Sequence, residues 1–147
     1  MVRKAVLLLS LIAATSLVFA QQEPQQSLPD NRDLVTRAKT VNVESDSFYV
    51  KRENLESSLL GRAEFKAWGL RITGRKDMAD LLIKVKRIPF SNHFTYTVTD
   101  RQTDTIVMAG KVDSLAGTVY GLIADEIVHK MKVYRGNPVA ASTPSKQ

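Results

Sequence analysis

Residues 79–112 contain three strand-like runs joined by two turns, and no other stretch constrains the fold as strongly. Apolar side chains and one glycine recur at every second position of the runs: Leu81, Ile83 and Val85, then Phe94, Tyr96 and Val98, then Ile106, Met108, Gly110 and Val112. Alternation of this kind, with β-branched and aromatic residues, is typical of half-buried antiparallel strands. The stretch therefore predicts a three-stranded β meander with one apolar face and one polar face.

The turn at residues 100–104 predicts how the second and third strands pair. If the aspartates at its two ends face each other, Tyr96 lies opposite Met108. The same register places Phe94 over Gly110, and an aromatic ring over a strand glycine covers exposed backbone. A slip of one residue would turn half of the apolar side chains to water, so the apolar pattern favours this register.

Two amphipathic segments flank the meander. The first helix is predicted over residues 51–68, with Leu55 and Leu59 on its apolar stripe. Gly61 in its middle lowers the helix propensity, and we interpret it as a point of close packing against the sheet. The second helix is predicted over residues 114–133, with an apolar stripe at helical spacing made of Leu115, Val119, Leu122, Ile123, Ile127 and Met131.

Short apolar runs at residues 38–43 and 70–73 add two strands, so the predicted order is β-α-β-β-β-β-α. Two amphipathic helices cannot bury their stripes alone, whereas a sheet with one apolar face can cover both. The sequence thus predicts an α+β fold, a two-layer sandwich of a mainly antiparallel sheet with two helices on one face. The other face is expected to present polar side chains to water, namely Lys84, Lys86, Thr95 and Thr97.

Residues 1–20 have the features of a secretory signal peptide, which are a basic start, an apolar stretch and a small residue at Ala20. Cleavage is predicted after Ala20. The alternative is a retained membrane anchor, although the apolar stretch is near the lower limit for spanning a bilayer and is interrupted by Ser10, Thr15 and Ser16. The chain has no cysteine, which excludes a lipidated amino terminus. We therefore expect an exported protein, periplasmic or extracellular, that is not lipidated.

Residues 21–37 are polar, contain two prolines and show no apolar periodicity, which predicts a flexible linker. The folded domain is expected at residues 38–134, followed by a disordered tail at residues 135–147. Without cysteine, packing alone must hold the domain together. The net charge of +6 falls to +4 when the two basic residues of the signal segment are removed, an excess too small to choose among anionic partners.

Candidate catalytic and metal-binding residues are few. His93 and His129 are the only histidines, and their spacing matches no metal motif. Asp125 and Glu126 are adjacent, so on a helix they point about 100° apart and do not converge as a catalytic carboxylate pair must. The sequence has no phosphate-binding loop, nucleophile elbow or calcium loop. We predict no catalytic, cofactor-binding or metal-binding residue, and we expect the chain not to be an enzyme.

Two surface features leave alternatives open. Asp80 stands at the start of a strand, where an Asx-type turn is favoured over a functional carboxylate. With His93 in a neighbouring loop, it would instead form a small-ligand-binding or hydrolytic site. Lys84, Lys86 and Arg87 form a possible binding surface for anionic lipid or glycan, against the alternative of a solvated sheet face. Nucleic acid is not an expected partner, because the neighbouring aromatic side chains would be buried on the opposite face.

Residues 64–70, 79–82, 94–100 and 109–112, followed by an amphipathic helix, form a pattern that covers residues 38–133. This pattern resembles small bacterial envelope domains of the type found at the amino terminus of TolB and in curli-secretion lipoproteins. The resemblance implies an assembly or interaction module without catalytic residues, although this chain lacks the cysteine of the lipoprotein members. We therefore expect an exported, non-enzymatic binding or scaffold domain of the bacterial cell envelope, with another envelope protein as its partner.

Overall fold

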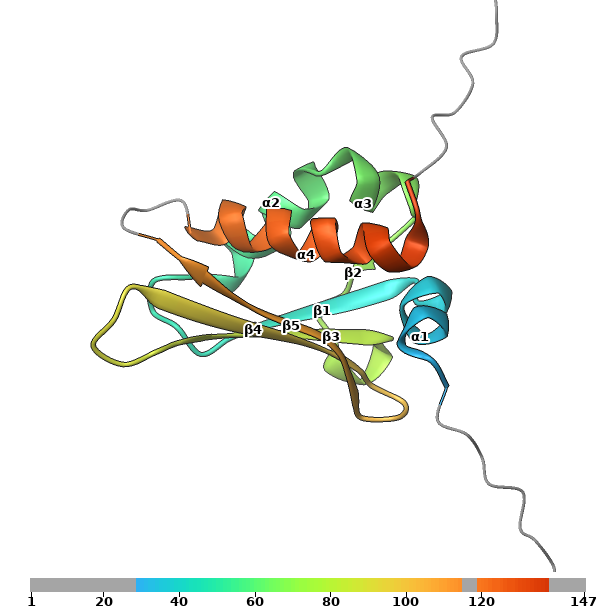
Figure 1. Ribbon diagram of the computed structural model, residues 1–147, viewed down its shortest axis with the longest axis horizontal. Coiled ribbons are helices and arrows are strands. Elements are labelled where there is room, and N and C mark those ends of the chain that lie inside the picture. Colours follow the sequence, from blue (N-terminus) through green and yellow to red (C-terminus); the bar gives the residue numbers. More distant parts are fainter. Residues whose placement is uncertain (1–28, 115–118, 138–147) are drawn as a thin grey trace, which may run out of the picture.

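The computed structural model describes residues 29–114 and 119–137 of the chain. Within this part, five strands form one sheet: β1 (Thr40–Ser45), β2 (Arg71–Ile72), β3 (Leu81–Arg87), β4 (His93–Asp100) and β5 (Thr105–Asp113). Their order across the sheet is β2-β1-β3-β4-β5 (Figure 1). Both neighbours of β1 run parallel to it, whereas β3–β4 and β4–β5 are antiparallel. The sheet is thus mixed, and the predicted meander is its antiparallel half.

The helices of the described residues are α1 (Asn31–Arg37), α2 (Arg52–Gly61), α3 (Ala63–Ala67) and α4 (Val119–Arg135), with a short 3-10 helix η1 (Lys76–Met78). Helices α2, α3 and α4 lie over one face of the sheet, and α1 lies at one end of it (Figure 1). Their apolar side chains and the alternate apolar residues of the long strands form a single core. The predicted α+β fold, with helices layered on one face of a sheet, is confirmed.

The predicted signal peptide at residues 1–20 lies outside the described residues, as do residues 21–28 and 138–147. Within residues 29–114 and 119–137, no helix has both the length and the apolar character that a bilayer crossing requires.

Helix α1 occupies residues that the sequence predicts as flexible linker, so that domain boundary is wrong. Its Leu34 and Val35 side chains are fully buried. Arg135 Nη2 donates hydrogen bonds to the carbonyl oxygens of Val35, at 2.7 Å, and of Ala38. Arg135 is itself the last residue of α4 and not the first residue of a tail. The sequence does not reveal this helix, because two adjacent apolar residues show no helical period. A helix this short is stabilised mainly by tertiary packing.

The single helix predicted over residues 51–68 is in fact two helices. Arg62, between α2 and α3, has an extended backbone with φ −78° and ψ 130°. Gly61 ends α2, and a side chain there would meet nothing within 4 Å, so its predicted role in close packing is wrong. The change of direction places Phe65 of α3 in the core, where it is fully buried.

Helix α4 is described over Val119–Arg135, Ser114 is not helical, and Leu115 lies outside the described residues. Leu122 is 45% exposed, so its predicted place on the apolar stripe is wrong. The buried face of α4 consists of Val119, Ile123, Ala124, Ile127, Val128 and Met131. Four of these six residues belong to the predicted stripe, which therefore identifies the face of the helix correctly.

The predicted pairing of β4 with β5 is wrong by two residues at Tyr96, which lies opposite Gly110 instead of Met108. A ring does cover the strand glycine, but it belongs to Tyr96 and not to Phe94. A methyl group added at Gly110 would lie 2.5 Å from Cε1 of the Tyr96 ring. Tyr96 and Met108 nevertheless share the buried face of the sheet.

A β-bulge in β5 accounts for one residue of this difference, and the turn accounts for the other, because Asp100 lies opposite Thr105 and not opposite Asp104. The register shifts between residues 98 and 99 of β4, where Val107 is the extra residue on β5. Val107 and Met108 are therefore both buried, whereas Ile106 is 57% exposed although the alternation predicts it on the core face. A period of two cannot reveal an inserted residue, because the pattern on either side of the bulge remains regular.

Candidate binding surface

Asp80 and His93, the two residues of the expected loop site, lie at opposite ends of the sheet. Asp80 directly precedes β3, whereas His93 begins β4, whose first residues pair with the last residues of β3. The length of β3, which has 7 residues, separates them by roughly 20 Å. They cannot form a single ligand-binding or hydrolytic site, and the hypothesis that joins them is corrected.

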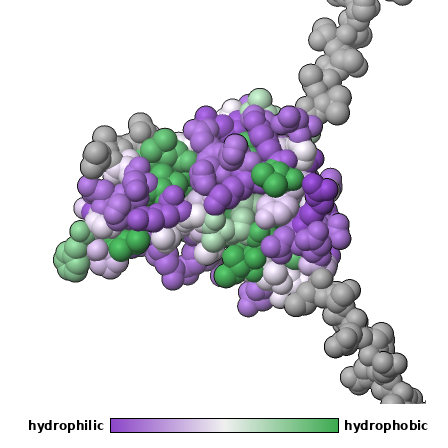
Figure 2. Space-filling view, in the orientation of Figure 1, coloured by the Kyte–Doolittle hydropathy of each residue, from purple (hydrophilic) through white to green (hydrophobic). Residues whose placement is uncertain are grey.

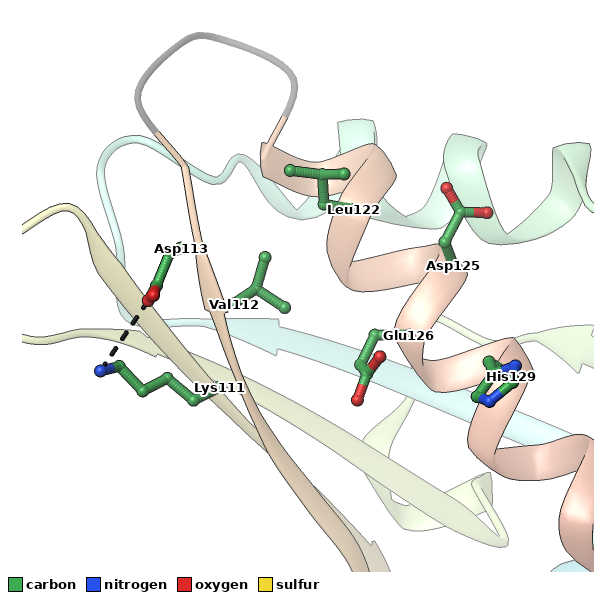
Figure 3. A pocket seen from close by; sticks show the side chains of 7 residues that line it. All are labelled: Lys111, Val112, Asp113, Leu122, Asp125, Glu126 and His129. Atoms are coloured by element: carbon green, nitrogen blue, oxygen red, sulfur yellow. Dashed lines mark ion pairs between the residues drawn. The ribbon is translucent and has the colours of Figure 1, made fainter.

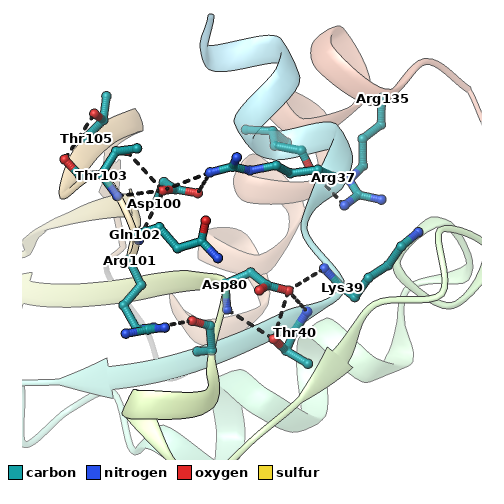
Figure 4. A network of polar contacts seen from close by, with 12 residues as sticks. Arg37, Lys39, Thr40, Asp80, Asp100, Arg101, Gln102, Thr103, Thr105 and Arg135 are labelled. Carbon is teal, nitrogen blue, oxygen red and sulfur yellow. Dashed lines mark hydrogen bonds and ion pairs between the residues drawn. The ribbon is translucent and has the colours of Figure 1, made fainter. Parts of the chain in front are cut away.

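Asp80 holds the start of β1 beside the start of β3 (Figure 4). Its Oδ2 atom accepts hydrogen bonds from the backbone N–H groups of Lys39, at 2.8 Å, and Thr40, at 2.9 Å, and from the Thr40 hydroxyl at 2.9 Å. Burial favours a higher pKa for Asp80, but these hydrogen bonds stabilise the ionised carboxylate and hold its pKa below the ordinary value. The contacts are those of a structural residue, although they tie two strands together instead of closing an Asx turn.

Asp100 has a similar structural role at the β4–β5 turn. It is 1% exposed, and its Oδ1 atom accepts hydrogen bonds from the N–H groups of Gln102, at 3.1 Å, and Thr103, at 3.0 Å. Arg37 of α1 donates to Oδ2 at 3.2 Å (Figure 4). Burial favours a higher pKa for Asp100, but these contacts stabilise the ionised carboxylate and hold its pKa below the ordinary value. We call this end of the sheet, with Asp80, Asp100 and their partners, the polar end.

His93 lies at the other end of the sheet, on the face opposite the helices. Its Nδ1 atom contacts Asp113 of β5, and Lys111 Nζ lies 3.8 Å from the same carboxylate oxygen. All three side chains are substantially exposed, and exposed ion pairs of this kind contribute little stability. Among the described residues, no three His, Asp or Glu side chains gather in a way that could hold a metal ion.

The expected basic surface divides between two faces of the sheet. Lys84 and Lys86 lie on the face opposite the helices, where Lys84 Nζ is 3.2 Å from a carboxylate oxygen of Asp46. Arg87 alternates to the other face, and its guanidinium carbon lies 4.1 Å from the centre of the Tyr49 ring. The three basic side chains therefore do not form one patch, but Lys86 and Arg87 both approach the same end of the sheet.

That end carries an apolar surface formed by residues 46–51, which link β1 to α2, and residues 88–92, which link β3 to β4. We call these two loops together the loop tip. Four large apolar side chains of the loop tip are exposed: Phe48 at 92%, Tyr49 at 61%, Ile88 at 38%, and Phe90 completely. Figure 2 shows apolar surface at the left-hand end of the molecule, where Figure 1 places the β3–β4 turn. Gathered apolar side chains with a polar rim are typical of interaction sites.

Specific contacts hold the two loops together. The Asp46 N–H group donates to the Val85 carbonyl oxygen at 2.9 Å, which extends the pairing of β1 with β3 into the loop tip. Arg87 Nε donates to the Ser91 carbonyl oxygen at 2.8 Å, while its guanidinium stacks on Tyr49. Arg87 therefore joins the β3–β4 turn to the other loop, and the loop tip is a preformed surface.

Phe90 has a strained backbone. Its φ angle of 57° lies in the left-handed region, which bulky side chains rarely adopt. This conformation costs about 1–2 kcal/mol for a residue with a Cβ atom. The turn therefore carries, at some cost in stability, a phenylalanine whose ring does not pack in the core.

Sequence reasoning missed the loop tip because it sought apolar side chains within strands and helices. A usable signal was present. Phe48 and Tyr49 follow Ser47, and Phe90 lies between Pro89 and Ser91. Serine and proline are typical of turns, and an aromatic residue inside a turn is not buried by strand alternation. Aromatic residues in predicted turns therefore mark the exposed rings.

A concave surface lies between β5 and α4 (Figure 3). It is an open groove of about 520 Å³ lined by Lys111, Val112, Asp113, Leu122, Asp125, Glu126 and His129. Asp125 pairs with Arg62 at 2.9 Å, and Glu126 pairs with Lys130 at 3.3 Å. The two carboxylates point to different sides of α4, as predicted, so the groove does not assemble a carboxylate pair for acid and base chemistry.

Comparisons with known proteins leave the chain without a family assignment. No family model matches it, and no curated protein matches it. Among solved structures, it is similar to a dodecameric PelC variant from Paraburkholderia phytofirmans, at 11% sequence identity and a TM-score of 0.31, over 67% of this chain and 86% of that chain. A likeness at this TM-score carries no argument about function. The resemblance to TolB and curli-secretion domains stays a prediction.

Proposed function

We propose that the chain is an exported, non-enzymatic binding or scaffold domain of the cell envelope that engages its partner through the loop tip. The observation that carries this proposal is the exposure of Phe48 and Phe90 on two loops that Arg87 holds together. Full burial of two phenylalanine side chains contributes about 3–6 kcal/mol before the costs of association. A partner that covers both rings would therefore gain a large part of its binding free energy from them.

The arrangement of the polar residues supports a binding role over a catalytic one. The carboxylates of Asp80 and Asp100 accept hydrogen bonds that hold strands and a turn in place. His93 is a strand length away from Asp80 and contacts Asp113 on the surface. An acid and a base held at reacting distance around a cleft would be needed for hydrolysis.

Export to the envelope is part of the proposal and rests on residues 1–20, with their basic start, apolar stretch and small residue at the expected cleavage position. A position outside the cytoplasm places the loop tip within reach of envelope proteins and membrane surfaces. The absence of cysteine from the whole chain leaves no cysteine for lipidation, so after cleavage of the signal segment attachment to the envelope would depend on a binding surface.

The proposal is tested by retention on the isolated envelope fraction of the cell that makes the protein. Phe48→Ser with Phe90→Ser removes both rings, and Met78→Ser is the matched control because Met78 is an exposed apolar residue of η1 near the polar end. We expect the wild type and the control to be retained equally and the double variant to lose at least about tenfold in affinity. Equal retention of all three proteins would contradict the proposal.

A further inference from the structure

We infer that the loop tip binds the surface of an anionic lipid bilayer, with its aromatic rings at the boundary between headgroups and acyl chains. This inference rests on the proposed function and names the partner of the same surface. Its first support is composition. Phe48, Tyr49, Ile88 and Phe90 supply three aromatic rings and one aliphatic side chain, and aromatic side chains with an apolar body are favoured at the membrane interface.

The second support is the charge around the rings. Lys51 lies two residues after Tyr49 in one loop, and Lys86 and Arg87 precede Ile88 at the other. Within the ranges that the structure describes, none of these three cations forms an ion pair with a carboxylate. Basic side chains beside a membrane surface are attracted to anionic lipids, and apolar insertion adds to this attraction.

Acidic residues near the loop tip reduce this charge but do not cancel it. Glu53, two residues after Lys51, is exposed and forms no ion pair within the described ranges, so it offsets one of the three cations. Asp46 is 3.2 Å from Lys84 Nζ, and Asp113 contacts both His93 and Lys111. Their charges are therefore compensated by basic groups other than those that flank the rings. The charge left beside the aromatic side chains is positive, which complements phosphate groups of anionic lipids.

The third support is shape. Figure 1 shows the β3–β4 turn extending beyond the helical layer, so Phe90 stands on a projecting turn rather than in a concavity. A protein partner of ordinary affinity covers about 800 Å² on each side and fills pockets with aromatic anchors. A bilayer needs no matching pocket, because its interface adapts around a projecting apolar group. A short projecting turn that carries an exposed aromatic ring therefore suits a membrane better than a protein surface.

The fourth support is rigidity. Arg87 joins the loops through its stacking on Tyr49 and its hydrogen bond to Ser91. Phe90 has a left-handed backbone, and its side chain is fully exposed in the unbound protein. A surface that is already ordered loses less conformational entropy on binding. The loop tip thus has apolar rings, unpaired cations and a fixed geometry in one place.

The test is sedimentation of the purified protein with vesicles of phosphatidylcholine alone and of phosphatidylcholine with phosphatidylglycerol. We expect binding to the anionic vesicles that weakens as salt is raised. Phe48→Ser with Phe90→Ser should weaken it at least about tenfold, and Lys86→Glu about threefold or more. Met78→Ser and Lys66→Glu are the matched apolar and charged controls, placed on η1 and α3, and should bind as the wild type does.

The outcomes separate this inference from the proposed function. If the protein binds neither vesicle while its retention on the envelope fraction still depends on both phenylalanines, the partner is a protein and only the membrane inference is overturned. If vesicle binding is unaffected by the double variant, the loop tip is not the membrane contact. If retention on the envelope fraction is also unaffected, the proposed function fails as well. Circular dichroism melting of each variant confirms that it is folded.

Discussion

The turns at the two ends of the sheet carry side chains of opposite chemistry. At the polar end, the carboxylates of Asp80 and Asp100 accept hydrogen bonds from backbone and hydroxyl groups. At the loop tip, Phe48 and Phe90 leave large apolar surfaces in water. The hydrogen bonds of the polar end stabilise the unbound fold. The exposed rings of the loop tip add little stability to it, and they become favourable only when a partner removes them from water. The comparison separates residues that hold the domain together from residues that are available to a partner.

The largest effect is expected from Asp100→Ala at the polar end. The substitution leaves the N–H groups of Gln102 and Thr103 and the guanidinium of Arg37 without their acceptor, so the free energy of unfolding should fall by about 2–4 kcal/mol. Urea unfolding measures the loss. Asp77→Ala, which removes an exposed carboxylate of η1, is the control and should unfold as the wild type does. Equal unfolding curves for the two variants would remove the structural role of the polar end.

Acid should weaken the polar end by a smaller amount. The folded-state pKa values of Asp80 and Asp100 lie below their ordinary values, so the unfolded chain binds protons more readily. Their contribution to stability is complete above the ordinary carboxyl pKa and is lost as the pH falls through that value towards the folded-state pKa. We expect the free energy of unfolding of the double variant Asp80→Asn with Asp100→Asn to fall less steeply with decreasing pH than that of the wild type. Unfolding curves collected across this pH range measure the difference. An unchanged slope in that variant would mean that other carboxylates control acid sensitivity.

The loop tip should behave in the opposite way. Phe48→Ser with Phe90→Ser removes no core contact, so the free energy of unfolding should change by no more than about 0.5 kcal/mol for each substitution. Retention on the envelope fraction should nevertheless fall at least about tenfold. A large loss of stability with unchanged retention would reverse the assignment of the two ends.

The smallest effect is expected from Arg87→Lys, which keeps the charge. Lysine cannot reproduce both the stacking on Tyr49 and the hydrogen bond to Ser91, so the two loops should hold each other less firmly. Binding to the envelope fraction should weaken by about twofold to fivefold, because more order must be gained on association. Binding equal to that of the wild type would show that the loop tip does not depend on this bridge. Arg75→Lys, at an exposed pair with Asp77, provides the comparison.

The sequence was sufficient for much of the fold. Strict alternation in β3 and β4 and the helical spacing in α4 identified the buried faces, because burial on one side of an element imposes a regular period. Features without a period were not predictable in this way. Val107 shifts the register by one inserted residue, and α1 buries only the adjacent Leu34 and Val35. The helix break at Arg62 likewise depends on packing of the neighbouring helix.

The candidate site was less predictable than the fold for the same reason. The charges of Lys86 and Arg87 suggest a basic patch. Strand alternation places the two side chains on opposite faces of the sheet, so they do not form a single patch. Phe48 and Phe90 obey no period, since exposure on a turn imposes none. The proximity of the two loops depends on the pairing of β1 with β3, which is parallel and joins segments distant in sequence. Only the three-dimensional structure brings the two loops together.

The most direct test places a photo-reactive benzoylphenylalanine at the position of Phe90 in one variant and of Met78 in another, within intact cells. Both positions are exposed, and they lie at opposite ends of the sheet. The account predicts covalent adducts, with lipid or with protein, at position 90 and not at position 78 after illumination. Adducts at position 78 with none at position 90 would contradict the claim that the loop tip is the binding surface.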